Sequence, residues 1–542
     1  MGNTIALPII CTISAYGVLF LSRAFYRTWT SPLRFIDGPE SFNFVVGHSI
    51  VFSDVPEQGD QWRKRYGETF MAKGLFWVND LHTTDLKAVS HVLSHASLYS
   101  RTPEFVASLS RILGEGLLSV SLDPHRRQRK ILNPAFNLQR IRLMNEIFFD
   151  NAILLRDLLS ADVEKAGGTA TINLAEMFRR VTLDIMGQAG FGYKFNSLES
   201  GGQNEGDLGK AFHMLFRGPN ANLNIAVQLA QSLVPILQYL PLPGWRNTQS
   251  GIKTLRSVGA ELLHKAKAEA RVLGEKDLGS GRDLLSILVK ANMSADIQDS
   301  QRLSDDEVIA QIPTFLLAGH DTSSIALGWA LHALSHHPEI QDKLRRELLS
   351  IDTDTPTMDE LNGLPFFENV VKEAMRLYSP VPFVQRTALQ DDVLPLGKPY
   401  VDRWGVSHEF LPITKGQCIT IPIQAINIDK ETWGDDALEF KPERWDNLPE
   451  AVHSVPGVWG NQLTFVAGAH SCIGFQFSVA EQKVILFSLL RAFEFLPGTE
   501  PVSPVISGQL ARPNSFVSDG KGGRVSSGGL SIVLKAYKGS SL

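Results

Sequence analysis

A ten-residue segment near the C-terminus places one cysteine between two glycines. It reads FVAGAHSCIG, with Gly468 and Gly474 on either side of Cys472. The glycines permit tight backbone turns, and residues 475–492 read as an apolar helix that begins just behind them. The free N–H groups and the positive end of that helix favour a thiolate at Cys472. Taken alone, the segment is equally compatible with an inert buried cysteine.

The cysteine count limits the other kinds of chemistry. The chain has three cysteines, Cys11, Cys418 and Cys472, and no CxxC pair. A structural zinc site and a disulfide framework therefore lack their residues, which fits a reducing, cytosol-facing location. The formal net charge is −5, without a basic block, so we expect no nucleic-acid partner.

The N-terminus contains an uncharged apolar stretch. Residues Thr4–Leu21 carry no charge, while Arg23, Arg27 and Arg34 follow. Eighteen residues of helix span roughly 27 Å, enough for a bilayer core, and the trailing arginines keep the body cytosolic. The alternative, a cleaved signal peptide, lacks its positive n-region. We expect three parts: a membrane anchor (1–22), a basic Pro/Gly hinge (23–40) and a catalytic domain (41–542).

The body reads as mainly helical. Hydrophobic residues recur at helical spacing in 141–159 and 255–272, whereas 74–78, 417–423 and 530–534 resemble strands. The composition, 44% hydrophobic and 20% charged, is globular. The predicted fold class is mainly α with small β-sheets in one domain.

One long helix is predicted in more detail. Ser304 and Glu307 have capping-box spacing, and an apolar run continues to Leu334. Such a helix is about 45 Å long and crosses a whole domain; Pro313 is expected to kink it. Residues 318–323, in its middle, place polar groups in an otherwise apolar helix. Burying such groups costs free energy unless they bind a polar partner.

Four short motifs follow one another along the chain. They are Ala-Gly-x-Asp-Thr (318–322), Glu-x-x-Arg (373–376), Phe-x-Pro-Glu-Arg (440–444) and Phe-x-x-Gly-x-x-x-Cys-x-Gly (465–474). Glu-x-x-Arg alone is usually an ion pair on a helix surface. With all four motifs in this order, the chain resembles a cytochrome P450, a haem-thiolate monooxygenase of the microsomal type. The resemblance extends from the hinge to the C-terminus.

The resemblance implies roles for particular residues. Cys472 corresponds to the thiolate ligand of haem iron, in a loop that includes Phe465, Gly468 and Gly474. Thr322 corresponds to the threonine that steadies the bound dioxygen, and Asp321 to the residue that relays the protons consumed in its reduction. Gly319 corresponds to a small residue that lets the helix open over the haem. A structural triad is implied as well, formed by Glu373, Arg376 and Arg444.

The haem propionates need cations, and the resemblance implies four partners for them. Arg129 and His125 match the family's Trp-x-x-x-Arg, with histidine in place of tryptophan. Arg386 is a third candidate, and His470 stands where the family most often has arginine. Imidazole can still donate to a carboxylate, although its charge near pH 6.5 is conditional.

The remaining expectations concern substrate and partners. No GxGxxG unit or flavin-sized extra domain is present, so electrons from NADPH would arrive through cytochrome P450 reductase, with cytochrome b5 as a second donor. The cofactor is haem b and the co-substrate O2. Candidate pocket residues are mostly apolar and favour a lipophilic substrate: the 104–118 loop, Phe315, Phe383, Val384 and Gln509–Ala511. The apolar segment 233–245 is expected to touch the membrane.

The residues within these motifs look like those of fungal members of the family that act in specialised metabolism. We therefore expect a terpenoid as the first candidate substrate. A fatty-acid or aromatic-compound hydroxylase is an alternative. So is a haem-thiolate isomerase or dehydratase, although Asp321 and Thr322 speak against it because it needs no proton relay. The expected location is the endoplasmic reticulum membrane, single-pass, with a cytosolic catalytic domain.

Overall fold

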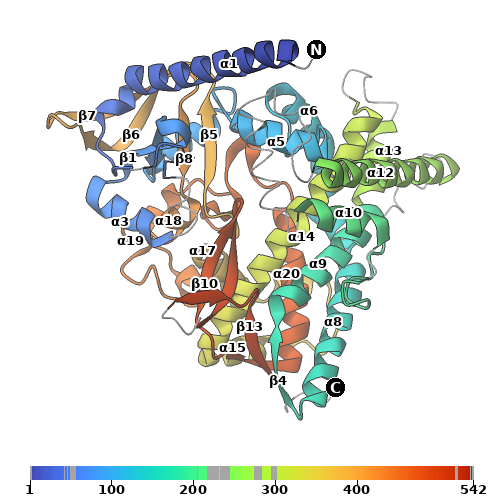
Figure 1. Cartoon of the computed structure of the whole chain (residues 1–542). Coiled ribbons are helices and arrows are strands. Elements are labelled where there is room, and N and C mark those ends of the chain that lie inside the picture. Colours follow the sequence, from blue (N-terminus) through green and yellow to red (C-terminus); the bar gives the residue numbers. More distant parts are fainter. Residues whose placement is uncertain are drawn as a thin grey trace.

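The computed structural model describes residues 3–41, 43–45, 47–48, 56–203, 206–216, 231, 245–273, 283–293, 302–518, 523–537 and 539. Helices make up most of the body, and small sheets lie in two places, beside α1 and in the lower middle of the view in Figure 1. This confirms the predicted class, mainly α with small β-sheets.

The helices and strands have the following bounds. The helices are α1 (Asn3–Thr30), α3 (Pro56–Tyr66), α4 (Leu86–Ser94), α5 (Pro103–Leu113), α6 (Leu122–Leu132), α7 (Leu138–Arg142), α8 (Asn145–Lys165), α9 (Leu174–Phe191), α10 (Gly206–Phe216), α12 (Trp245–Leu273), α13 (Leu284–Met293), α14 (Asp305–His336), α15 (Pro338–Leu348), α16 (Met358–Asn362), α17 (Pro365–Leu377), α18 (Ile423–Asn427), α19 (Lys430–Trp433) and α20 (Phe475–Ala492). The strands are β1 (Thr69–Lys73), β2 (Asn79–Thr83), β3 (Tyr99–Ser100), β4 (Thr169–Asn173), β5 (Val384–Ala388), β6 (Asp392–Val401), β7 (Ser407–Ile413), β8 (Cys418–Ile421), β9 (Phe493–Pro497), β10 (Val502–Ser507), β11 (Leu510–Ser518), β12 (Arg524–Ser526) and β13 (Ser531–Ala536).

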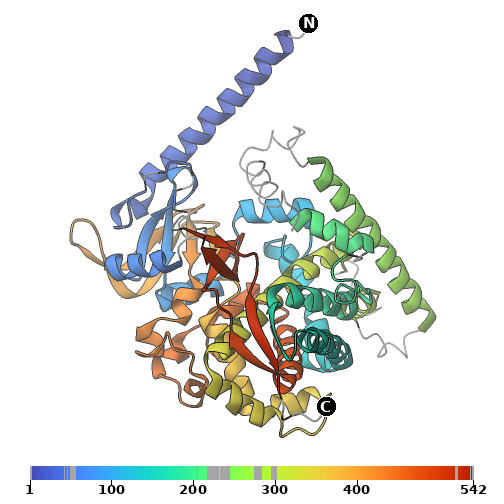
Figure 2. The same cartoon turned by 60° about the horizontal axis from the view of Figure 1, so that its bottom comes forward.

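Helix α1 projects from the body, as Figure 2 shows. It runs to Thr30, past the expected boundary at residue 22, and its C-terminal end is held where Arg27 donates to the carbonyl of Gly416. Among the described residues, no helix is both long enough and apolar enough to cross a membrane. The structure therefore does not support the predicted spanning anchor.

The largest sheet has the strand order β1-β2-β8-β5-β3, with β2 and β8 parallel. The strand expected at 74–78 is wrong: Leu75–Trp77 form a 3-10 turn, because Phe76 and Trp77 have φ of 55° and 62°, which a pleated strand cannot accommodate. The strands expected at 417–423 and 530–534 are confirmed as β8 and β13.

Helix α14 lies in the middle of the helical layer (Figure 1). Its capping box is confirmed: the Ser304 hydroxyl accepts from the Glu307 amide at 3.2 Å, and the Glu307 carboxylate accepts from the Ser304 amide at 2.9 Å. The helix continues without interruption through Pro313 to His336. Most of its side chains are buried against α9, α20 and the surrounding core.

The other predicted helices are found with shifted ends. Residues 255–272 lie within α12, and 475–492 coincide with α20. The expected helix 141–159 is divided, because α7 ends at Arg142 and α8 begins at Asn145. The apolar segment 233–245 lies outside the described residues except for Trp245.

Candidate functional site

The cysteine loop is closed by its own backbone. The amide of Cys472 donates to the carbonyl of Phe465 at 2.9 Å, and the chain reverses through Val466 and Gly468, which have φ of 58° and 71°. A Cβ on Gly468 would lie 2.0 Å from the carbonyl oxygen of Leu93, so only glycine fits there. Gly474 has φ of −93°, which any residue adopts, so its predicted turn does not need glycine.

The Cys472 side chain faces a large cavity. Its position two residues before Gly474 puts it directly in front of α20. Burial raises the pKa of the Cys472 thiol, while the Gly474 backbone N–H and the Arg129 guanidinium oppose that shift. Both opposing groups stabilise a thiolate, which is the form that binds a metal ion.

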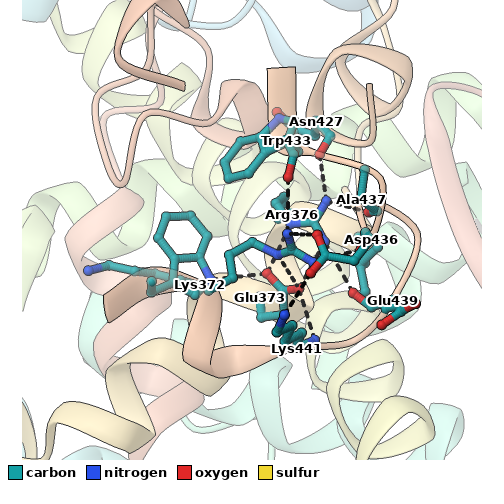
Figure 3. Close-up of polar contacts among 12 residues, drawn as sticks. Lys372, Glu373, Arg376, Asn427, Trp433, Asp436, Ala437, Glu439 and Lys441 are labelled. Carbon is teal, nitrogen blue, oxygen red and sulfur yellow. Dashed lines mark hydrogen bonds and ion pairs between the residues drawn. The ribbon is translucent and has the colours of Figure 1, made fainter. Parts of the chain in front are cut away.

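Behind the loop, Glu373 binds two arginines (Figure 3). Arg376 donates to both of its carboxylate oxygens, at 2.9 and 2.8 Å, and Arg444 donates to one of them at 3.1 Å. The side chains of Glu373 and Arg376 are fully buried, and Arg444 is nearly so. The structure thus brings the predicted triad together, and the indole of Trp445 adds a bond to Glu373 at 3.0 Å.

The triad is connected to the cysteine loop through Asn427. Arg376 donates to the Asn427 carbonyl at 2.9 Å, and the Asn427 side chain binds the Leu463 amide at 2.8 Å and the Thr464 hydroxyl at 2.9 Å. Thr464 directly precedes Phe465, the residue whose carbonyl accepts from Cys472. Removing the buried charge of Glu373 would therefore disturb the support of the cysteine.

Three arginines gather on one side of the cavity. The cavity lining includes Arg101, Arg129 and Arg386. Burial lowers the pKa of His125, and the positive charge of each of these arginines lowers it further. Burial lowers the pKa of Arg101 to about 9 and that of Arg386 to about 10, and for Arg101 the two other arginines add to the effect. Buried charges of one sign are costly without an anion between them.

Two histidines complete this cluster. The rings of His125 and His470 are 4.2 Å apart, and burial lowers the pKa of both, to about 3 and about 2. Nε2 of His125 and Nδ1 of His470 are buried and have no hydrogen-bond partner among the described residues. Arg129 also donates to the carbonyl of Ser471 at 2.5 Å, which links the cluster to the cysteine loop.

Helix α14 presents small and polar residues to the same cavity. Ala318 is exposed to it, and the Thr322 hydroxyl donates back to the Ala318 carbonyl at 2.6 Å. Gly319 packs against Met186 of α9: an added Cβ would lie 2.2 Å from the Met186 methyl group. Glycine at 319 thus permits close packing of the helix against α9.

Asp321 points toward an arginine from the C-terminal sheet. Arg512 on β11 donates to its carboxylate, with Nη2–Oδ2 at 3.0 Å and Nη1–Oδ1 at 3.5 Å. Nε2 of His320 lies 3.3 Å from Oδ1 of Asp321. The Asp321 side chain is only 5% exposed, so this ion pair is largely protected from water.

These residues line one connected cavity of about 2390 Å³, which extends as far as α1, α3 and α19. Phe315, Phe383, Val384 and Gln509–Ala511 line it, as predicted. The segment 104–118 also contributes lining residues, but most of it is helix α5 rather than a loop. The lining is largely apolar, which suits a lipophilic molecule.

Arg101 and Arg512 line this cavity as well, although neither was predicted from the sequence. Arg101 follows the short strand β3 and belongs to no motif, so no signal in the sequence indicated it. Arg512 had a signal: it directly follows the predicted pocket segment 509–511 and is a charge beside mostly apolar neighbours.

Comparisons with known proteins agree with this geometry. The model of the cytochrome P450 family matches residues 38–517. "Cytochrome P450 monooxygenase 205" of Postia placenta is 44% identical over 86% of this chain and 87% of its own. "Cytochrome P450 monooxygenase claQ" of Ampulloclitocybe clavipes is 34% identical over 91% and 92%, and "Ganoderic acid synthetase CYP5150L8" of Ganoderma lucidum 33% identical over 87% and 89%. The chain belongs to the cytochrome P450 monooxygenase family.

The residues present fit the haem that the family implies. Cys472 offers a thiolate at one wall of the cavity, and Arg101, Arg129 and Arg386 offer positive charge for two carboxylates. The unpartnered nitrogens of His125 and His470 are further donors in the same place. Haem supplies exactly the groups that such a set lacks: an iron for the thiolate and propionates for the cations.

Proposed function

We propose that this chain is a haem-dependent monooxygenase that inserts one oxygen atom of O2 into a lipophilic small molecule of fungal specialised metabolism, a terpenoid first of all. The observation that carries the proposal is one cavity that is lined both by Cys472 and by Ala318, Asp321 and Thr322. The cavity therefore brings together a haem ligand, room for a substrate and groups that can pass on protons.

Each residue has a distinct role in the proposal. Haem, bound by Cys472, supplies the oxygen-activating chemistry. Thr322 provides a hydroxyl on the substrate side that steadies O2, and Asp321 passes on the protons that the reduction of O2 consumes. Arg101, Arg129, Arg386, His125 and His470 hold the propionates. Glu373, Arg376 and Arg444 keep the cysteine loop in shape.

The substrate class follows from the cavity lining and from the relatives. Phe315, Phe383 and Val384 make the wall apolar, which favours a molecule that enters from a lipid phase. One relative is named a ganoderic acid synthetase, which supports a role in specialised metabolism.

Partners and location belong to the same proposal. Electrons come from NADPH through cytochrome P450 reductase, with cytochrome b5 as a second donor. The uncharged stretch Thr4–Leu21 and the arginines that follow it support a place at the endoplasmic reticulum membrane with the body on the cytosolic side.

The carbon monoxide difference spectrum of the reduced full chain tests the proposal, run beside Cys472→Ser. A strongly red-shifted Soret band that the variant loses supports thiolate-ligated haem. Well-folded, haem-containing protein without that band would refute Cys472 as the ligand. Lipophilic compounds, terpenoids first, are then screened with reductase and NADPH. Product that requires both O2 and NADPH separates a monooxygenase from an isomerase.

A further inference from the structure

Behind the cysteine loop lies a small hydrophobic cluster that is separate from the main core. Its buried members are Ala326, Met375, Phe465 and Val479, and the partly buried Trp459 and Phe475 pack against them. Phe465 has a particular place in this cluster, because its carbonyl accepts the amide of Cys472 at 2.9 Å. Whatever holds Phe465 therefore also holds the backbone of the cysteine.

The ring of Phe465 is in contact with two other aromatic rings. The ring of Trp459 lies 5.7 Å from it, centroid to centroid, with an angle of 63° between the planes. The ring of Phe475, the first residue of α20, lies at 5.9 Å and 53°. Inclined contacts of this kind are favourable for aromatic pairs. Trp459 thus limits how far Phe465, and the loop that carries it, can move.

Trp459 is itself anchored to an ion pair between two helices. Its indole Nε1 donates to Oε1 of Glu368 on α17 at 3.2 Å. Nζ of Lys483 on α20 lies 2.7 Å from Oε2 of the same carboxylate, and Nζ of Lys372 lies 3.3 Å from Oε1. Burial alone would raise the pKa of Glu368, but the two lysines hold it below its usual value. The carboxylate is therefore a fixed negative charge that joins α17 to α20 and holds the indole.

The backbone after Trp459 adds a second connection to α17. The side chain of Gln462 is fully buried. Its amide nitrogen donates to the Lys372 carbonyl at 3.3 Å, and its oxygen accepts the Thr464 hydroxyl at 2.9 Å. The segment that leads to Phe465 thus has a support of its own, in addition to the triad.

We propose that Trp459 is a positioning residue for Cys472: by holding Phe465 in the cluster, it fixes the loop around the thiolate and so sets the reduction potential of the haem iron. The groups around a metal ligand orient it, and the apolar shell controls the access of water and with it the potential. The reduced site carries one more negative charge than the oxidised one, so water admitted to a loosened loop favours reduction. This inference rests on the proposed function, because it requires haem bound by Cys472.

Potentiometric titration of the full, haem-loaded chain tests the proposal. Trp459→Ala removes both the ring contact and the indole donor. We expect it to raise the equilibrium constant for reduction of the iron by about tenfold, which is about 59 mV for one electron. Trp459→Phe keeps an aromatic ring beside Phe465 and should show less than half of that shift in potential. If Trp459→Ala does not retain haem, Trp459→Leu takes its place, with a shift in the same direction.

The matched control is Trp404→Ala, which removes a tryptophan that is 65% exposed between β6 and β7 and should leave the potential unchanged. An unchanged potential in Trp459→Ala, together with a lower unfolding midpoint, would show a purely structural role and overturn the proposal. An equal shift in Trp459→Phe would also overturn it, because the ring contact with Phe465 would then have no effect on the potential.

The carbon monoxide spectrum distinguishes a failure of this inference from a failure of the proposed function. A wild-type chain without the red-shifted Soret band refutes the haem assignment itself. A normal band in every variant, combined with equal potentials, refutes only the role of Trp459.

Discussion

Arg512 of β11 forms an ion pair with Asp321 in the middle of α14, at 3.0 Å between Nη2 and Oδ2. The pair connects the sheet that lines the substrate cavity to the carboxylate proposed to pass on protons. Neighbouring bonds fix the strand: the Ala511 amide donates to the Pro380 carbonyl at 2.9 Å, and the Trp329 indole donates to the Ala511 carbonyl at 3.0 Å.

Replacing Arg512 should therefore impair proton delivery more than substrate binding. We expect Arg512→Ala to lower product per NADPH by about tenfold or more, since positioned acid–base groups contribute roughly 10²–10⁴-fold. Hydrogen peroxide brings oxygen, electrons and protons together, so peroxide-driven turnover should be largely kept, and Arg512→Lys should recover part of the loss. Equal losses in both assays would instead indicate a role in substrate binding. In an Asp321→Asn background, Arg512→Ala should cause little further loss.

Thr322 lies one position beyond Asp321 and lines the cavity, and its hydroxyl donates to the Ala318 carbonyl at 2.6 Å. We expect Thr322→Ala to continue consuming NADPH while hydrogen peroxide replaces product. Thr322→Ser keeps the hydroxyl and should stay near the wild-type ratio. Fully coupled product formation in Thr322→Ala would remove Thr322 from the mechanism.

Glu373 neutralises two buried arginines, so its replacement should be severe. Glu373→Gln removes the carboxylate that pairs with Arg376 and leaves Arg444 only its ion pair with Asp436. Breaking a buried pair in this way costs about 3–5 kcal/mol. We expect little haem-containing protein, measured as the ratio of Soret to protein absorbance after purification. Glu443→Gln is the matched control, because Glu443 forms an exposed ion pair with Lys343. Normal haem content in Glu373→Gln would contradict the role assigned to the triad.

Arg101 provides a separate test of the cation cluster. Arg101→Gln should release haem faster, by roughly the tenfold that 1.4 kcal/mol represents, because one of the three arginines of the cluster is lost. Transfer of haem to apomyoglobin measures the rate. Arg126→Gln is the control, since the Arg126 side chain is 78% exposed. Equal rates in the two variants would place Arg101 outside the haem site.

A buried carboxyl on α20 predicts how stability changes with pH. Glu481 is fully buried, and burial raises its pKa from 4.5 to about 8, an effect that the Ser323 hydroxyl opposes. Between these two values the native chain holds a proton that the unfolded chain releases, so the free energy of unfolding falls as pH rises through this window, by at most about 1.4 kcal/mol per pH unit.

We expect Glu481→Gln, which stays neutral, to show a flatter dependence of the unfolding midpoint between pH 5.5 and 7.5 and a higher midpoint at pH 7.5. Glu494→Gln serves as the control, because Glu494 pairs with Lys535 at the surface. If the two variants have parallel pH profiles, Glu481 is ionised in the native protein.

Local patterns in the sequence were sufficient for some elements and not for others. The capping box at Ser304 and the apolar run behind it predicted α14, because both signals lie within one helix. The turn at Phe76 was read as a strand, because positive φ at an aromatic residue has no local signal. The spacing of Glu373, Arg376 and Arg444 indicated the triad only through the family resemblance.

The charged contacts of the cavity depended on long-range packing. Arg512 meets Asp321 across 191 positions of sequence, which no periodicity reports. The cluster of Arg101, Arg129 and Arg386 comes from three separate parts of the chain, and only the folded structure shows that these charges lie close together. Both findings needed the structure, whereas Cys472 did not, because its loop is contiguous.

The parallel pairing of β2 with β8 also determines when this protein can finish folding. Leu81 pairs with Ile419, so the sheet beneath α1 stays incomplete until most of the chain has left the ribosome. Such long-range pairing slows folding and leaves strand edges open in the meantime. We therefore expect the nascent chain to depend on chaperones, and truncations before β8 to aggregate instead of forming a stable N-terminal half.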